Sequence, residues 1–157
     1  MAKSDTRKTA TPEAGRTRAR RNAMMVLYKV DLLPSGQVQD SLDAFESEHG
    51  FPLPRYAREL VVGVSGNIER IDAELDSRLT GWSLGRLGAV ERSIMRIAMY
   101  ELLTADVPYQ VVIDEAIELA KRYASPEAAK LVNGVLGTYV RQLNAGELDE
   151  KTAGDTE

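Results

Sequence analysis

The stretch Leu87–Asp106, LGAVERSIMRIAMYELLTAD, decides the fold. Its apolar residues recur at intervals of three and four, which predicts a helix. They form two neighbouring stripes, the first with Val90, Ile94, Ile97 and Ala98 and the second with Met95, Met99 and Leu102. A helix that is apolar this far around must be surrounded by other helices. We therefore expect it to be the central helix of an all-α bundle.

Length and composition fit one globular domain. The chain has 157 residues, and 43% of them are hydrophobic, which is enough for a core. No apolar run approaches the roughly 20 residues that span a bilayer, and the N-terminus lacks the apolar stretch of a secretory signal. We expect a cytoplasmic protein with no membrane partner. The absence of cysteine excludes disulfides and thiolate metal sites.

Helical periodicity continues on both sides of the central segment, and glycines and prolines separate the helices. The first helix is expected to start at Arg16 and to stop before Pro34. Further helical segments are Gln37–Glu48, Arg55–Val64, a segment after Asn67 as N-cap, one from Pro108 to Tyr123, and one that Ser125 caps. With a short turn before the central helix, this makes a single-domain bundle of about seven helices.

Glycines interrupt the last of these helices. Gly134 and Gly137 lie in its interior, where each costs about 1 kcal/mol relative to alanine. We expect that cost to be offset by close contact with a neighbouring helix. Asn133, beside Gly134, is either an exposed polar reader of a ligand or a satisfied structural residue.

The expected organisation has three parts. Residues 1–15 are polar and broken by Pro12 and Gly15, so they are expected to form an arm without fixed structure. Residues 16–143 form the helical domain. Residues 144–157 are expected to form a disordered acidic tail with a local charge of −4, from one basic and five acidic residues.

The net charge of −4 conceals an asymmetry. Residues 1–22 hold seven basic and two acidic side chains, a local charge of +5, which leaves −9 for the rest of the chain. A basic segment on an acidic body indicates either a polyanion site confined to one place or a solvated leader. Charge alone does not decide between them.

Four arginines, Arg16, Arg18, Arg20 and Arg21, lie at the start of the first helix. Helical spacing projects Arg16 and Arg20 on one side and Arg18 and Arg21 around the other. The planar fork of arginine suits phosphate, and an anion would relieve the repulsion between these charges and the helix dipole. Tyr28, two to three turns further on, either stacks on an unpaired base or packs at the edge of the core.

No arrangement for catalysis is found. The chain lacks a nucleophile with its base, a phosphate-binding loop and zinc-ligand spacing, so we expect neither enzyme activity nor a cofactor. Asp114 and Glu118 share a helix face, but carboxylate metal sites in bundles also need Glu-x-x-His pairs. Lys121 lies at ion-pair spacing from Glu118. His49, the only histidine, lies at a helix end, where we expect it either to interact favourably with the helix dipole or to cap a carbonyl.

Several stretches resemble the NusB family in the family's order. They are RARRNAMMVLYKVD at 18–31, ERSIMRIAMYELL at 91–103, VPYQVVIDEAIELAKRY at 107–123 and KLVNGVL at 130–136. The resemblance runs from about Arg16 to Leu143. It implies an all-helical bacterial transcription antitermination factor that binds boxA-like single-stranded RNA together with the ribosomal protein NusE, and so promotes processive transcription of ribosomal RNA operons. Other Nus factors and RNA polymerase would be indirect partners.

The resemblance also implies roles for individual residues. The RNA contacts would be Arg16, Arg18, Arg20, Arg21, Tyr28 and Lys130. Glu91 and Tyr28 would lie at the surface for NusE, and a basic ribosomal protein suits the acidic body. The sequence departs from the family pattern at Asp114, where asparagine is frequent, and at Gly137, where aspartate is common. These departures affect local contacts rather than the fold.

Two alternatives remain. The chain could form a homodimer that buries the surface expected to bind RNA and NusE. RNA would then bind weakly or at another place. It could also be an RNA-guiding module of a ribosomal RNA methyltransferase, although it has neither the length of that catalytic domain nor a cofactor-binding loop. Sedimentation with and without NusE would distinguish the homodimer from the heterodimer.

Overall fold

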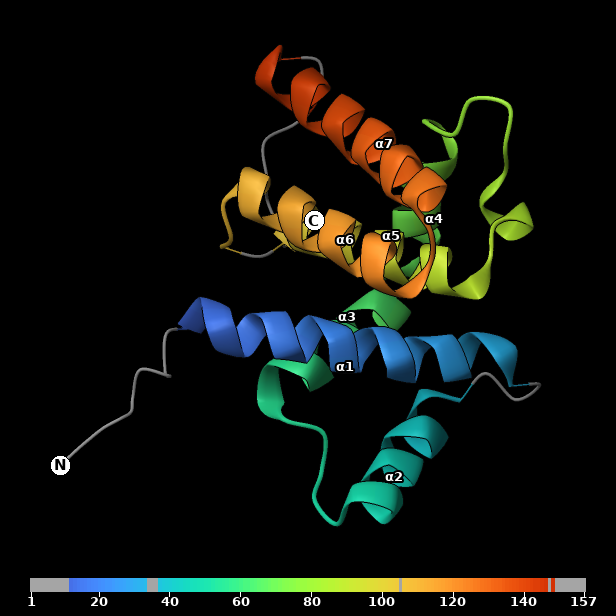
Figure 1. Ribbon diagram of the computed structural model, residues 1–157, viewed down its shortest axis with the longest axis vertical. Coiled ribbons are helices and arrows are strands. Elements are labelled where there is room, and N and C mark those ends of the chain that lie inside the picture. The colour runs from blue at the N-terminus through green and yellow to red at the C-terminus, as the bar shows by residue number, and fades with distance from the viewer. Residues whose placement is uncertain (1–11, 34–36, 105, 147, 149–157) are drawn as a thin grey trace, which may run out of the picture. The chain divides into compact units, whose positions relative to one another are not determined.

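The computed structural model describes residues 12–33, 37–104, 106–146 and 148, and all the regular structure among them is helical (Figure 1). The α-helices are α1 Pro12–Leu32, α2 Val38–His49, α3 Arg55–Gly66, α4 Ile68–Asp76, α5 Ala89–Thr104, α6 Tyr109–Tyr123 and α7 Pro126–Asn144, and a 3₁₀ turn, η2 Leu84–Arg86, precedes α5. This confirms the expected all-α fold. None of the described helices is both long and apolar enough to cross a membrane.

The first helix begins earlier than the sequence analysis predicted. α1 starts at Pro12 rather than at Arg16, so the last part of the expected unstructured arm is helical. The physical reason is that proline suits the first helical position, where its missing N–H would have no partner in the helix. The rest of the arm, residues 1–11, and most of the expected acidic tail, residues 147 and 149–157, lie outside the described residues.

The chain divides into two compact units, residues 1–62 and 63–157. In the first unit, α2 packs against α1. α1 contributes to the core the side chains of Ala19, Ala23, Met24, Val26 and Leu27, and the beginning of α3 contributes Ala57, Leu60 and Val61. α2 itself buries only Ser41 completely. It ends at Gly50, whose left-handed backbone, with φ of 83°, allows its N–H to donate to the carbonyl of Glu46.

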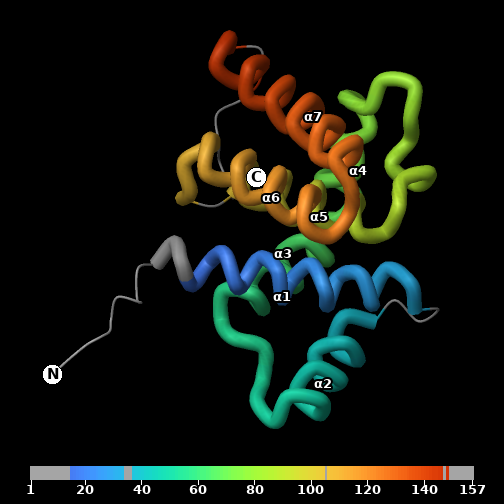
Figure 2. The backbone as a smooth tube through the Cα atoms, in the orientation of Figure 1, coloured from blue at the N-terminus to red at the C-terminus, as the bar shows by residue number. Residues whose placement is uncertain are grey.

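In the second unit α5 is the central helix, in contact with α4, α6 and α7. Both predicted stripes are buried, through Ile94, Met95, Ile97, Ala98, Met99 and Leu102, and only Val90 at the helix start stays half-exposed. α6 and α7 lie side by side in both backbone views (Figures 1 and 2). As predicted from its two apolar stripes, α5 is surrounded by other helices of this unit.

Polar side chains join the helices of this unit. Arg96 of α5 donates two hydrogen bonds to the carboxylate of Asp72 in α4, at 2.8 and 2.9 Å. Arg78, after α4, donates to Glu74 at 2.8 Å and to Gln142 of α7 at 2.9 Å. Its guanidinium also lies 4.9 Å from the ring centroid of Tyr139. Arginine thus supplies links between α4 and both α5 and α7.

Tyr139, in α7, is a buried titratable group. Burial, followed by the nearby carboxylate of Glu74, raises the pKa of its phenol above the usual value, against the opposing effect of Arg70 and Arg78. The neutral phenol is therefore favoured in the folded protein.

The two predicted helix caps have different outcomes. The Ser125 hydroxyl accepts a hydrogen bond from the Ala128 N–H at 3.0 Å, as expected for a cap of α7. Asn67 stands at the start of α4, but its side chain makes no capping bond there. It donates instead to the carbonyl of Gly63 at 2.8 Å. Because α3 ends immediately before α4 begins, an unpaired carbonyl of α3 is within reach of the amide.

The expected close helix contact at Gly134 is wrong. A Cβ at this position would meet nothing within 4 Å, because Gly134 lies on the exposed side of α7. At Gly137 the nearest group is the guanidinium of Arg141, 3.3 Å from a Cβ, which belongs to the same helix. The glycine that does allow a close approach is Gly63 in α3, where the ring of Tyr100 occupies the place of a side chain.

Candidate nucleic-acid interface

The exposed face of α1 carries basic, polar and aromatic side chains. Arg18 and Tyr28 are exposed and Arg21 is partly so. Arg21 and Tyr28 are seven residues apart, so they lie on the same side of the helix, about 10 Å from each other along its axis. Arg18 is three residues before Arg21 and belongs to the same surface. Three of the residues expected to contact RNA therefore share one accessible face.

Arg16 lies elsewhere. Because it is two residues before Arg18, it points to the other side of α1. There its guanidinium carbon stands 4.5 Å from the ring centroid of Tyr56 in α3. Arg16 is half-buried, as is Tyr56. A role for Tyr56 beside the first helix could not be predicted from the sequence, because no local pattern connects the two.

Arg20 is buried, with 1% of its surface exposed, and it takes part in interactions within the fold. A buried charge must be paired or hydrogen-bonded. Its burial argues against a direct contact with phosphate in this conformation. A sequence signal for this was present, because Arg20 precedes Ala23, Met24 and Leu27 of the apolar stripe by three, four and seven residues.

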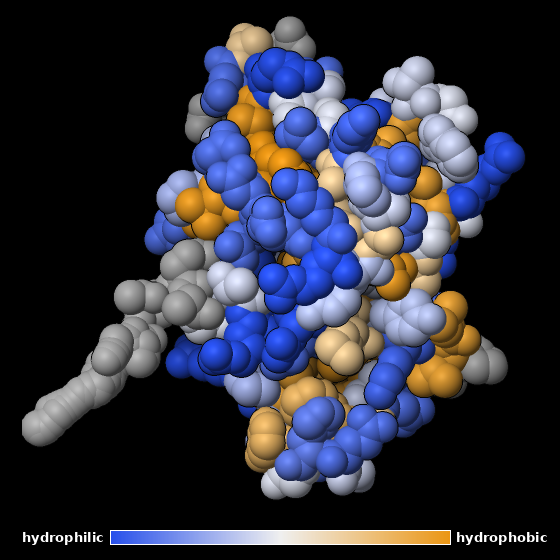
Figure 3. Space-filling model, viewed as in Figure 1, coloured by the Kyte–Doolittle hydropathy of each residue, from blue (hydrophilic) through white to orange (hydrophobic). Residues whose placement is uncertain are grey.

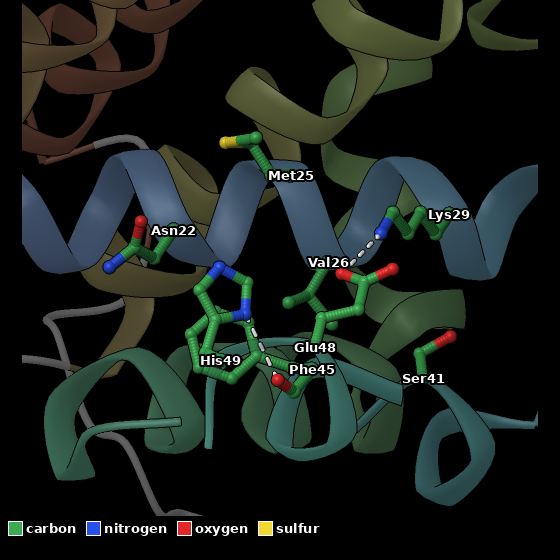
Figure 4. A pocket seen from close by; sticks show the side chains of 8 residues that line it. All are labelled: Asn22, Met25, Val26, Lys29, Ser41, Phe45, Glu48 and His49. Carbon is green, nitrogen blue, oxygen red and sulfur yellow. Dashed lines mark hydrogen bonds and ion pairs between the residues drawn. The ribbon is translucent and has the colours of Figure 1, made fainter. Parts of the chain in front are cut away.

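A pocket of about 200 Å³ lies between α1 and α2 (Figure 4). Its lining consists of Asn22, Met25, Val26 and Lys29 from α1 and Ser41, Phe45, Glu48 and His49 from α2. The Lys29 ammonium lies 3.4 Å from the Glu48 carboxylate and so links the two helices. The Ser41 hydroxyl is buried and has no hydrogen-bond partner among the described residues.

His49 stands at the end of α2, beside this pocket. Its Nδ1 lies 3.0 Å from the carbonyl oxygen of Phe45, and its ring stacks on the Phe45 ring with centroids 4.0 Å apart. This confirms the expected capping of a carbonyl at a helix C-terminus.

The other two predicted site residues belong to the second unit. Lys130 is exposed in α7, and its role as an RNA contact stays a prediction. Glu91 is half-exposed in the first turn of α5, with a carboxylate oxygen 2.5 Å from the place of a Cβ on Gly88. Its assignment to the NusE surface also stays a prediction.

The carboxylates that could suggest metal chemistry have ordinary partners. Asp114 accepts a hydrogen bond from Gln110 at 2.8 Å, and Glu118 lies 3.8 Å from the Lys121 ammonium. Across the described ranges no group of three or more histidine, aspartate or glutamate side chains is placed to hold a metal ion. On the face drawn in Figure 3, hydrophilic side chains cover most of the surface, and hydrophobic ones reach it in separate places.

Sequence comparison places this chain among known proteins. The model of the NusB family matches residues 17–141. The transcription antitermination protein NusB of Anaeromyxobacter dehalogenans is 41% identical over 140 residues, which cover 87% of this chain and 97% of the relative. The protein of the same name from Desulfitobacterium hafniense is 39% identical over 139 residues, covering 85% and 91%.

Solved structures agree with the sequence comparison. NusB of T. maritima superposes with a TM-score of 0.72 at 32% identity and covers 88% of this chain and 99% of its own. A chain from a crystal structure of the antitermination factors NusB and NusE in complex with dsRNA gives 0.69 at 31% identity, with 80% and 96% covered. Sequence and structure lead to the same conclusion: this chain belongs to the NusB family.

Proposed function

We propose that this protein is a transcription antitermination factor that binds boxA-like single-stranded RNA together with the ribosomal protein NusE, and so promotes processive transcription of ribosomal RNA operons. Its relatives are named as antitermination proteins, and one similar structure holds NusB and NusE in complex with dsRNA. Other Nus factors and RNA polymerase are indirect partners in this proposal. The protein acts in the cytoplasm by binding, without a chemical reaction of its own.

The observation that carries the proposal is the exposed face of α1, which presents Arg18, Arg21 and Tyr28 along the same helix. Guanidinium groups bind phosphates through paired N–H donors. An exposed aromatic ring gives an unpaired base a surface on which to stack. One helix face thus offers both elements of single-stranded RNA binding, and the proposal assigns that binding to the helical domain, residues 16–143.

The remaining site residues have different roles in this proposal: RNA contact, support of the fold or contact with NusE. Arg16 contacts a phosphate from the side of α1 that faces Tyr56, and Lys130 adds a further basic contact from α7. Arg20, being buried, supports α1 from within the fold. Glu91 and Tyr28 contact NusE, since opposite charges guide a basic ribosomal protein to an acidic surface.

The proposal is tested by fluorescence anisotropy of a labelled boxA-like RNA, titrated with the protein alone and with NusE over a salt series. We expect NusE to tighten binding and the logarithm of the association constant to fall linearly with the logarithm of the salt concentration. The slope for single-stranded nucleic acid is about −0.7 for each phosphate neutralised.

Variants then locate the site. Arg18→Ala and Arg21→Ala should each weaken binding and make the slope shallower by about 0.7. Arg70→Ala, which removes an exposed arginine from α4 in the second unit, is the matched control and should change neither. Unaltered binding by both α1 variants would contradict the assignment of RNA to α1.

The alternative is a homodimer that buries the same face of α1. It is favoured by the exposed apolar side chains Met25 and Leu32, which lie on α1 with Tyr28. Sedimentation velocity with and without NusE separates the two possibilities. A dimer that NusE leaves unchanged would contradict the proposed heterodimer.

A further inference from the structure

We propose that Tyr56 is a positioning residue for RNA binding, because its ring holds the guanidinium of Arg16 in place for a phosphate. The inference rests on the proposed function and adds to it a residue from α3. Its basis is the contact between two helices of the first unit, in which the guanidinium carbon of Arg16 lies 4.5 Å from the centre of the Tyr56 ring.

The geometry of this contact leaves Arg16 able to bind. A cation within about 6 Å of an aromatic ring centre is attracted by the negative face of the ring. The five N–H donors of a guanidinium lie in its own plane, and phosphate binds at that edge. Because the contact is made by the guanidinium carbon over the ring, it restrains the arginine and leaves N–H donors for a phosphate.

The restraint matters because of where Arg16 stands. It lies in the second turn of α1, within five residues of Arg18, Arg20 and Arg21, and these positive charges repel one another. An arginine without a lateral contact would spread over many rotamers and would have to be ordered on binding. Ordering one long side chain in advance is worth about three- to tenfold in affinity.

The experiment compares Tyr56→Leu with Tyr56→Phe in the anisotropy assay described above. Phenylalanine keeps the aromatic face, whereas leucine keeps apolar bulk only. We expect Tyr56→Leu to weaken RNA binding about three- to tenfold, and Tyr56→Phe to bind within about twofold of the parent protein. The salt slope of Tyr56→Leu should stay that of the parent protein, because Arg16 still neutralises its phosphate once bound, whereas the slope of Arg16→Ala should become shallower by about 0.7.

A double-variant cycle separates positioning from a general effect on the fold. If Tyr56 acts through Arg16, Tyr56→Leu has no further effect in a protein that already carries Arg16→Ala. An equal loss in both backgrounds would overturn the inference, as would parent-like binding by Tyr56→Leu. Failure of the parent protein to bind the RNA at all would instead contradict the proposed function.

Circular dichroism shows whether each variant is folded. If Tyr56→Leu does not fold, Arg16→Lys tests the positioning role of Tyr56 instead, because lysine keeps the charge but lacks the planar guanidinium. In that case Arg16→Lys should weaken binding about three- to tenfold. Parent-like affinity of Arg16→Lys would overturn the inference.

Discussion

Two glycines of this chain show how the surroundings of a single residue decide its role. Gly63, in α3, is approached so closely by the ring of Tyr100 that a side chain there would overlap the ring. Gly134, in α7, has nothing within 4 Å of the place of a Cβ. Both lie inside helices, where alanine is intrinsically favoured by about 1 kcal/mol. The two positions differ only in what stands next to them.

We predict opposite effects of the same substitution at these positions. Gly134→Ala should raise the free energy of unfolding by about 0.5–1 kcal/mol, because it gains helix propensity and meets no neighbour. Gly63→Ala should lower it, because overpacking against Tyr100 costs about 1–3 kcal/mol and exceeds the gain in propensity. Urea denaturation measures both values. An increase in stability for Gly63→Ala would show that the Tyr100 ring moves aside freely.

At the scale of elements, one arginine adds a two-point polar contact between α4 and α5. Arg96 donates one hydrogen bond to each carboxylate oxygen of Asp72, and the side chains of the pair are only 15% and 29% exposed. A second pair, Arg55 with Glu59 in α3, has similar chemistry but is 91% and 52% exposed. Two-point hydrogen bonding in a partly desolvated place is stronger than a solvated pair on one helix.

We predict that Arg96→Lys lowers the free energy of unfolding by about 1–2 kcal/mol, because lysine keeps the charge but loses one arm of the fork. Arg55→Lys is the matched control and should change stability by less than about 0.5 kcal/mol. Thermal melts of both variants, followed by circular dichroism, measure the difference. Equal effects at the two positions would mean that the fork adds nothing to the contact of α4 with α5.

The stability of the whole molecule should depend on pH in the alkaline range through Tyr139. The pKa of this phenol is raised in the folded protein, first by burial and then by Glu74. The folded protein therefore keeps the proton to higher pH than the unfolded chain, whose tyrosines titrate near 10. This stabilisation is complete below about pH 10, and it is lost as the pH rises through the raised pKa.

We predict that the free energy of unfolding of Tyr139→Phe falls less than that of the parent protein between pH 9 and about pH 11, because phenylalanine does not ionise. Urea denaturation at a series of pH values measures the slope. Tyr123→Phe, which alters an exposed tyrosine at the end of α6, serves as the control for other alkaline effects. Parallel slopes for Tyr139→Phe and the parent would remove Tyr139 as the cause.

Much of the fold could be predicted from local patterns. The double stripe of α5 predicted a central helix, and the sequence of Ser125 and Pro126 predicted the start of α7. Asn67 stands at the N-cap position as predicted, but its missing capping bond and the failed prediction at Gly134 each depend on a neighbour. An amide can bond backward as easily as forward, and a glycine allows a close contact only where another element approaches.

The candidate site divides in the same way. Helical spacing alone separated Arg16 and Arg20 from Arg18 and Arg21. It also aligned Arg20 with the apolar stripe of α1, where Arg20 is buried, but it did not indicate that Arg16 would lie over an aromatic ring. Tyr56 could not be found from the sequence, because nothing near it along the chain relates it to an arginine of α1.

The sequence by itself determined where the helices lie and which faces are apolar, because periodicity and capping depend on residues within one or two turns of each other. Only the tertiary structure decided which arginine of α1 is accessible, which is buried and which is held by Tyr56. Burial and stacking depend on elements that are distant along the chain, so they exist only after α1, α2 and α3 have packed together.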